Sequence, residues 1–189
     1  DLSTPTFTNG NCPRVTIGNY PNFQIIVKKG QTTLSLNKVT MTGQITLEDG
    51  AHFNADDFTI VSTSNNIQAT SDNAVTIQNS EFTVTSQNHV VINNTGSPIT
   101  ITNCKFNGET TEYALLLDNI ASANIVNNRI SSGHGVYIGS SSSIYFSHNT
   151  FDRCLRYIQL YDLATDPGYL FTFQQNIFGS NFLSDHGMR

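Results

Sequence analysis

The residues best suited to chemistry gather near the carboxyl-terminal end of the sequence, where tyrosines alternate with hydrogen-bonding side chains. They are Tyr137, Arg156, Tyr157, Gln159, Tyr161 and Asp162. Tyrosine rings offer apolar faces on which a sugar ring packs, while the polar side chains can bond its hydroxyl groups. If Ile158 and Leu160 face a core, the residues that alternate with them face solvent. The sequence therefore predicts a sugar-binding surface. The open alternative is that these tyrosines cover a sheet or contact a neighbouring loop or subunit.

A histidine between two glycines is a second candidate. The segment GHGVYIGS around His134 resembles a signature of the polygalacturonases, which hydrolyse pectin on a parallel β-helix. That resemblance also implies carboxylates about one turn earlier, because hydrolysis needs an acid and a base. The only Asp-Asp pair, Asp56-Asp57, lies about three turns too early, and no Arg-Ile-Lys follows. We therefore assign no catalytic residue and expect His134 to occupy a solvent-exposed bend.

Acidic residues in the first third of the chain could bind a cation. They are Glu48, Asp49, Asp56 and Asp57. Pectate and alginate lyases pair such carboxylates, as Ca²⁺ ligands, with a basic residue. Glu48 and Asp49 are adjacent and would point to opposite sides of a strand. We expect solvated loop carboxylates, and we predict neither a metal nor a cofactor.

A repeat explains what positions these side chains. The pattern apolar-x-apolar-x-Asn-x-x-Phe begins at residues 75, 99, 123, 144 and 171, so successive copies are 21 to 27 residues apart. Alternating apolar residues indicate strands with one buried face, and stacked copies of such strands share an interior. The expected interior residues are Val75, Ile77, Phe82, Ile99, Ile101, Phe106, Ile125, Phe146, Phe151, Phe171 and Phe173. The residue after each strand forms a predicted ladder, namely Asn79, Asn103, Asn127, His148 and Gln175.

A second strand follows in each repeat, as in VVINN, ALLLDN, GVYIGS and YIQLYD. From Ile25 to Phe178 the chain resembles the right-handed parallel β-helix superfamily, which includes pectate lyases, polygalacturonases and phage tailspikes. The resemblance implies an all-β, single-stranded right-handed parallel β-helix (a solenoid) of about seven turns. Residues 1–24, which hold three of the five prolines, are expected to form an irregular cap. The helix should occupy residues 25–189 and could continue beyond them.

Composition limits the partners. A net charge of −5 without a Lys/Arg cluster larger than Lys28-Lys29 argues against nucleic acid. No apolar run is long enough for a membrane span. Cys12, Cys104 and Cys154 fit no metal spacing. Cys104 and Cys154 follow units two turns apart, about 10 Å along the axis, which is too far for a disulfide. We expect both to be buried thiols.

The carboxyl-terminal edge is expected to need a partner. Only eleven residues without a helical pattern follow the last repeat, FTFQQNIF, and open strand edges invite pairing. We expect the edge to continue into further sequence or to be covered by another subunit.

The segment from Phe151 to Phe182 resembles β-helix proteins at the surface of Bacteroidetes-type bacteria, which accompany polysaccharide uptake systems. That resemblance implies a secreted or cell-surface, glycan-associated protein without a catalytic triad. The resulting hypothesis is a non-catalytic β-helix that binds a polysaccharide or cell-surface glycan, or serves in adhesion or as a structural or filament element. The alternative is a polysaccharide lyase or glycoside hydrolase acting on pectin-like or other uronate polysaccharides, or a fragment of one.

Overall fold

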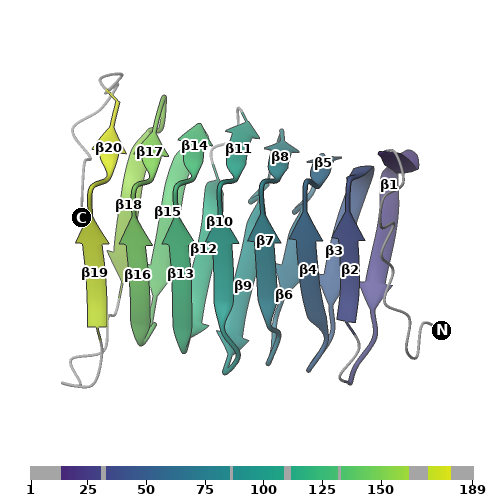
Figure 1. Cartoon of the computed structure of the whole chain (residues 1–189), viewed down its shortest axis with the longest axis horizontal. Helices are drawn as coiled ribbons and strands as arrows, with labels where there is room; N and C mark the ends of the chain where they lie inside the picture. Colours follow the sequence, from purple (N-terminus) through teal and green to yellow (C-terminus); the bar gives the residue numbers. More distant parts are fainter. Residues whose placement is uncertain are drawn as a thin grey trace.

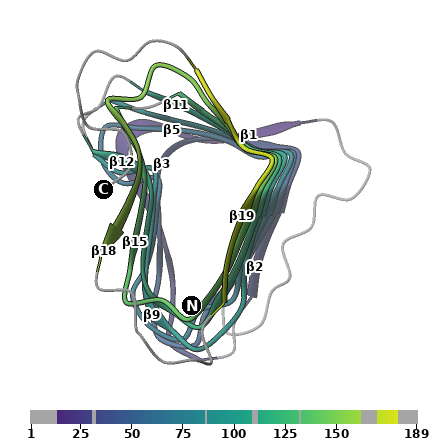
Figure 2. The same cartoon turned by 90° about the vertical axis from the view of Figure 1, so that its left-hand side faces the viewer.

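The structure is a computed structural model that describes residues 14–30, 33–85, 87–108, 112–131, 133–161 and 170–179. In these residues, short parallel strands follow one another around a single coil that advances steadily from β1 to β20 (Figure 1). Seen along the coil, the strands outline three faces joined by bends (Figure 2). A complete turn therefore contributes one strand to each face, whereas the sequence predicted at least two strands per turn.

The three faces are stacks of parallel strands. The first face contains the end of β3 (Val39–Leu47), then β6 (Ile67–Ala69), β9 (Val90–Thr95), β12 (Tyr113–Ile120), β15 (His134–Gly139) and β18 (Arg156–Tyr161). The second contains β2 (Thr33–Asn37), β4 (His52–Asp56), β7 (Val75–Gln78), β10 (Ile99–Thr102), β13 (Ser122–Val126), β16 (Ser143–Ser147) and β19 (Leu170–Gln174). The third contains β5 (Thr59–Ser62), β8 (Glu81–Val84), β11 (Lys105–Gly108), β14 (Arg129–Ser131), β17 (Thr150–Phe151) and β20 (Ile177–Phe178). This is the all-β parallel helix of about seven turns that the sequence predicted.

The core lies inside the coil, where equivalent residues of successive turns stack. On the second face Val75 pairs with Ile99, and Ile99 pairs with Ala123. Nine of the eleven predicted interior residues have at most 1% of their surface exposed. The other two predictions were wrong in degree: Phe171 is half-buried, and Phe173 is 38% exposed. Both belong to β19, the last described strand of its face, so no further described turn covers them.

The predicted ladder residues mark the tight bend between the second and third faces. Each of the five has a positive φ, between 50° and 57°, a conformation that asparagine adopts more readily than most residues. The Asn103 amide donates to Asn79 Oδ1 at 3.2 Å, and the Asn127 amide donates to Asn103 Oδ1 at 2.6 Å. The side-chain ladder ends there, because His148 Nδ1 is instead bonded to Ser147 Oγ. Those five residues thus form one column of bends, and the first three are joined by amide bonds.

A second amide ladder, which the sequence analysis missed, lies one residue further along and inside the coil. It consists of Asn128, Asn149 and Asn176. The main-chain nitrogen of Asn128 donates to Asn149 Oδ1 at 2.9 Å, and that of Asn149 donates to Asn176 Oδ1 at 2.9 Å. Asn128 and Asn149 are almost completely buried. Their amides therefore satisfy main-chain groups that water cannot reach.

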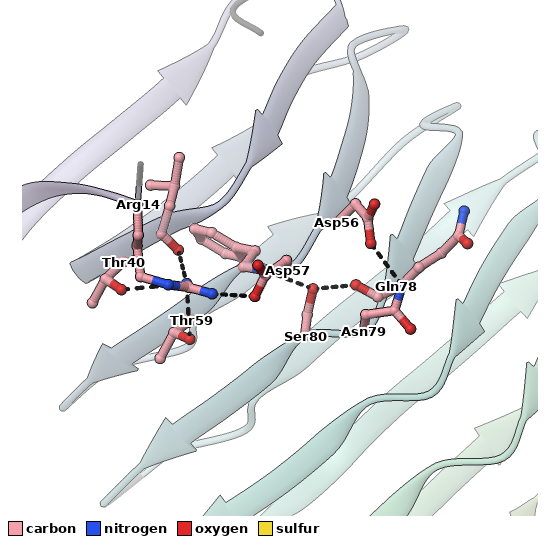
Figure 3. A network of polar contacts seen from close by, with 10 residues as sticks. Arg14, Thr40, Asp56, Asp57, Thr59, Gln78, Asn79 and Ser80 are labelled. Carbon is pink, nitrogen blue, oxygen red and sulfur yellow. Dashed lines mark hydrogen bonds and ion pairs between the residues drawn. The ribbon is translucent and has the colours of Figure 1, made fainter. Parts of the chain in front are cut away.

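The coil begins earlier than predicted. Residues 15–24, expected to belong to an irregular cap, lie in β1 (Val15–Val27), which pairs in parallel with β3. Its register shifts twice, between Ile17 and Asn19 and between Asn19 and Gln24. Arg14 fixes the start of β1 through an ion pair with Asp57 and a hydrogen bond to Val39 O at 3.2 Å (Figure 3). Residues 1–13, the rest of the predicted cap, lie outside the described residues.

Two cysteines are buried as expected. Cys104 and Cys154 are free thiols with 1% and 4% of their surface exposed. Burial raises the pKa of Cys104 to about 12, so the neutral thiol is its stable form. Cys12 lies outside the described residues.

Candidate functional site

The outward side of β12, β15 and β18 collects the side chains best suited to bind a ligand. We call this set the tyrosine surface, and it consists of Tyr113, Asp118, His134, Tyr137, Arg156, Gln159 and Tyr161. The parallel register creates it, because Tyr113 pairs with His134 and His134 with Arg156, while Tyr137 pairs with Gln159. Residues from three separate turns thus become neighbours.

Three tyrosine rings run obliquely across this surface. The ring centroids of Tyr113 and Tyr137 are 5.5 Å apart, and those of Tyr137 and Tyr161 are 6.5 Å apart. The second pair is stacked, with 26° between the ring planes. Tyr161 is the most open, with 62% of its surface exposed, while Tyr113 and Tyr137 are half-buried. The rings form a continuous aromatic strip along the direction in which the turns stack.

Gln159 holds two of the polar groups in place. Its side-chain oxygen accepts a hydrogen bond from the Tyr113 hydroxyl at 2.5 Å and another from Arg156 Nη1 at 3.3 Å. These bonds link β12 to β18 across β15. The Tyr113 phenol and the Arg156 guanidinium are therefore oriented before any ligand arrives, which reduces the entropy lost on binding.

His134 borders the strip and packs against Tyr113, with ring centroids 5.1 Å apart. Burial lowers the pKa of His134, and the nearby charge of Arg156 lowers it further, against an opposing effect of Glu112. His134 is the first residue of β15 and is half-buried. The expectation of a solvent-exposed bend histidine was wrong, because the strand begins one residue earlier than the period-2 pattern suggested.

The glycine after His134 has a packing role. A Cβ on Gly135 would lie 2.2 Å from Tyr157 O and 2.8 Å from the Phe151 ring. The first face turns towards the third at this point, and two consecutive residues, Gly135 and Val136, both face inward. The Gly-His-Gly segment thus fits a crowded corner of the coil, and this packing requires no catalytic role.

The same corner moves one predicted ligand-binding residue into the core. Tyr157 and Ile158 are both buried, with 4% and 2% of their surface exposed. The Tyr157 hydroxyl donates to Gly179 O, and its ring packs against Phe151 and Phe178. The prediction that Tyr157 faces solvent was wrong, because strict alternation fails where the chain bends. Asp162 lies outside the described residues.

Of the other predicted ligand-binding residues, the structure brings Tyr137, Arg156, Gln159 and Tyr161 together. Sequence reasoning missed Tyr113 and did not connect Asp118 with the tyrosines. One signal was present, because Tyr113, Tyr137 and Tyr161 are each 24 residues apart, close to the repeat length.

The carboxylates of the first turns have partners of their own. Glu48 accepts from Lys28 Nζ at 2.9 Å, and this bond, with a second from the Lys29 main chain, lowers the pKa of Glu48. Asp49 accepts from the Ser71 hydroxyl at 2.8 Å. Further along, Asp56 accepts from Asn79 at 2.7 Å, while Asp57 pairs with Arg14 (Figure 3). Within the described ranges, no three His, Cys, Asp or Glu side chains cluster as metal ligands.

The second face offers less to a ligand. A hollow of about 280 Å³ crosses β10, β13, β16 and β19, and its lining includes Thr100, Asn124, Tyr145 and Thr172. Tyr145 is its only aromatic side chain, and no charged side chain lines it. Since the tyrosine surface has three rings and charged groups, we take it as the candidate site.

Comparison with known proteins places the chain in a family. The family model described as a right-handed β-helix region matches residues 43–188, which is most of the chain and most of the described coil. The chain therefore belongs to the right-handed β-helix family. No curated protein and no solved structure matches it. The described residues contain no helix that is long and apolar enough to cross a membrane.

Proposed function

We propose that this protein binds a polysaccharide or cell-surface glycan on the tyrosine surface and does so without catalysing a reaction. The observation that carries the proposal is the strip formed by Tyr113, Tyr137 and Tyr161, with centroid spacings of 5.5 and 6.5 Å. Flat apolar rings flanked by hydrogen-bonding groups suit sugar rings, which have apolar faces and polar edges. The strip follows the coil, so an extended glycan chain can contact several turns at once.

The polar partners support the same assignment. Gln159 and Arg156 lie beside the rings and are already hydrogen-bonded to one another. Their remaining donors can bond sugar hydroxyl groups without a large loss of side-chain entropy. Glycans of this kind are found outside the cell, so the proposal includes a secreted or cell-surface location.

The enzymatic alternative is tested by the same assay. Glycoside hydrolysis uses two carboxylates on opposite sides of the scissile bond. On the tyrosine surface itself Asp118 is the only carboxylate. Release of reducing or unsaturated ends during incubation with the glycan, with or without Ca²⁺, would contradict the non-catalytic proposal.

Affinity measurement tests the proposal directly. Isothermal titration calorimetry with a panel of soluble polysaccharides would identify a ligand, and Tyr161→Ala and Tyr137→Ala would be compared with the wild type. We expect each variant to weaken binding by roughly threefold to tenfold, since one aromatic contact is lost. Tyr145→Ala on the second face is the matched control and should bind normally. Unchanged affinity in both tyrosine-surface variants would exclude this site.

A further inference from the structure

Asp118 occupies an unusual place on the tyrosine surface. It is half-buried and lies on β12, beside Gly139 of β15, which in turn pairs with Tyr161 of β18. Among the described residues, no group donates a hydrogen bond to its carboxylate. By contrast, the acids of the first turns have basic or hydroxyl partners. The Asp118 oxygens are thus available as acceptors at the edge of the aromatic strip.

Gly139 allows two functional groups to converge. A Cβ at this position would lie 2.4 Å from Asp118 Oδ1, 2.9 Å from the Tyr137 ring and 3.1 Å from the Tyr137 hydroxyl. The absent side chain therefore lets the carboxylate and the phenol approach the backbone from two sides. The result is an acceptor pair and a hydroxyl next to the stacked rings of Tyr137 and Tyr161.

This arrangement suits one kind of ligand. A carboxylate has two acceptor oxygens and no donor, so it can accept hydrogen bonds from two neighbouring hydroxyl groups of a sugar. The adjacent rings would then pack against the sugar's apolar face. A sugar without free hydroxyl groups there would leave the carboxylate desolvated and unpaired, which is costly.

Charge decides between neutral and acidic sugars. A polyuronate carries a negative charge on every unit, whereas this protein has a net charge of −5. Arg156 is the only arginine or lysine on the tyrosine surface, and its Nη1 already bonds Gln159. A uronate next to Asp118 would place like charges together, which is unfavourable.

We propose that the ligand of the tyrosine surface is a neutral glycan, bound through two adjacent hydroxyl groups by Asp118, and that polyuronates are excluded. This inference rests on the glycan-binding function proposed above. It adds the substrate class and names Asp118 and Gly139 as the residues that determine specificity.

Titration calorimetry at pH 7 and fixed salt tests it with two groups of polymers. The neutral probes are galactomannan, xyloglucan and arabinoxylan, and the acidic probes are polygalacturonate and alginate. We expect the wild type to bind a neutral probe and neither acidic one. Asp118→Asn keeps the shape but removes the charge, and it should weaken binding of the neutral probe about tenfold, since charge-assisted bonds are replaced by neutral ones.

Asp72→Asn is the matched control. Asp72 also accepts a hydrogen bond, from Ser97 at 2.7 Å, but lies away from the tyrosines, so this variant should bind like the wild type. Melting temperatures would establish that both variants are folded. Gly139→Ala should weaken binding by displacing Asp118 and Tyr137.

The outcomes separate the two proposals. Tighter wild-type binding to a polyuronate than to any neutral probe would overturn the inference while leaving glycan binding intact. So would a loss of binding in Tyr161→Ala with unchanged affinity in Asp118→Asn. Failure of every polymer to bind would overturn the proposed function itself.

Discussion

The side-chain oxygen of Asn128 accepts a hydrogen bond of 2.9 Å from the main-chain nitrogen of Cys104, one turn earlier in the coil. The amide nitrogen of Asn128 donates to Ile101 O at 2.9 Å and to Asn149 Oδ1 at 3.0 Å. One buried side chain thus satisfies main-chain groups of the preceding turn and a side chain of the following one. This relationship holds the corner between the second and third faces.

Replacing Asn128 should therefore be far more damaging than replacing the asparagine before it. Asn128→Ala leaves at least two buried main-chain groups unpaired, and we expect a loss of about 2–4 kcal/mol in the free energy of unfolding. Asn127→Gly is the matched control, because glycine tolerates the positive φ of this exposed position. It should cost at most about 1 kcal/mol. Urea denaturation measures both, and equal losses would contradict the inner ladder.

The buried His89 should make the protein sensitive to acid. Burial lowers the pKa of His89 to about 3, whereas an unfolded histidine has a pKa near 6.5. Between these values the unfolded chain binds more protons than the folded one, so the free energy of unfolding falls as the pH falls. The expected contribution is about 1.4 kcal/mol per pH unit below about pH 6.5, ending near pH 3.

Denaturation from pH 7 to pH 4 would isolate this contribution in His89→Gln, which should show a shallower pH dependence than the wild type. His148→Gln is the control, because the equivalent bend of the next turn already holds Gln175 at a similar φ. It should retain the wild-type slope. The same slope in all three proteins would contradict the role of His89.

Gly135→Ala tests the crowded corner after His134. The added methyl group would overlap Tyr157 O and the Phe151 ring, and we expect a loss of about 1–3 kcal/mol from the strain of accommodating it. Gly96→Ala is the matched control, because its nearest described neighbour would be 3.4 Å away, an ordinary contact. Thermal unfolding compares the two. A stable Gly135→Ala variant would show that this corner is looser than the structure indicates.

Cys104 should resist alkylation in the folded protein. Its pKa of about 12 and its 1% exposure leave almost no accessible thiolate at neutral pH. With iodoacetamide at pH 8, peptide mass spectrometry should find Cys104 unmodified without denaturant and modified in urea. Rapid labelling of the native protein would mean that the turn containing Cys104 opens readily.

The described carboxyl-terminal turn should promote self-association of this 189-residue chain. Ile177 and Leu170 are 63% and 67% exposed, and β18, β19 and β20 each have one edge without a described partner strand. Apolar side chains beside open strand edges favour pairing with a second copy. Light scattering should show a mass that rises with concentration, and Ile177→Lys or Leu170→Lys should reduce the rise. Val61→Lys, at a 41% exposed position on the third face, should not, and a monomer at all concentrations would contradict the prediction.

The repeat in the sequence was sufficient to predict the coil. Apolar residues at every second position, repeated at intervals of 21 to 27 residues, can be buried only if copies of the strand stack, because one strand cannot cover its own apolar face. The stacked positions of Val75 and Ile99, and the bends at Asn79 and Asn103, follow from that pattern. These features are local and repeat in every turn, so a single alignment of the chain with itself reveals them.

The corners and the site were decided by the tertiary structure. Alternation determines which side of a strand a residue faces, but it fails where the chain turns. At such corners Tyr157 and Ile158 are both buried, and Asn128 lies inside while Asn127 lies outside. The meeting of Tyr113 with Tyr137 depends on how far each turn is offset from the next. That offset is set by loop lengths and by packing across the core, which no single segment of the sequence contains.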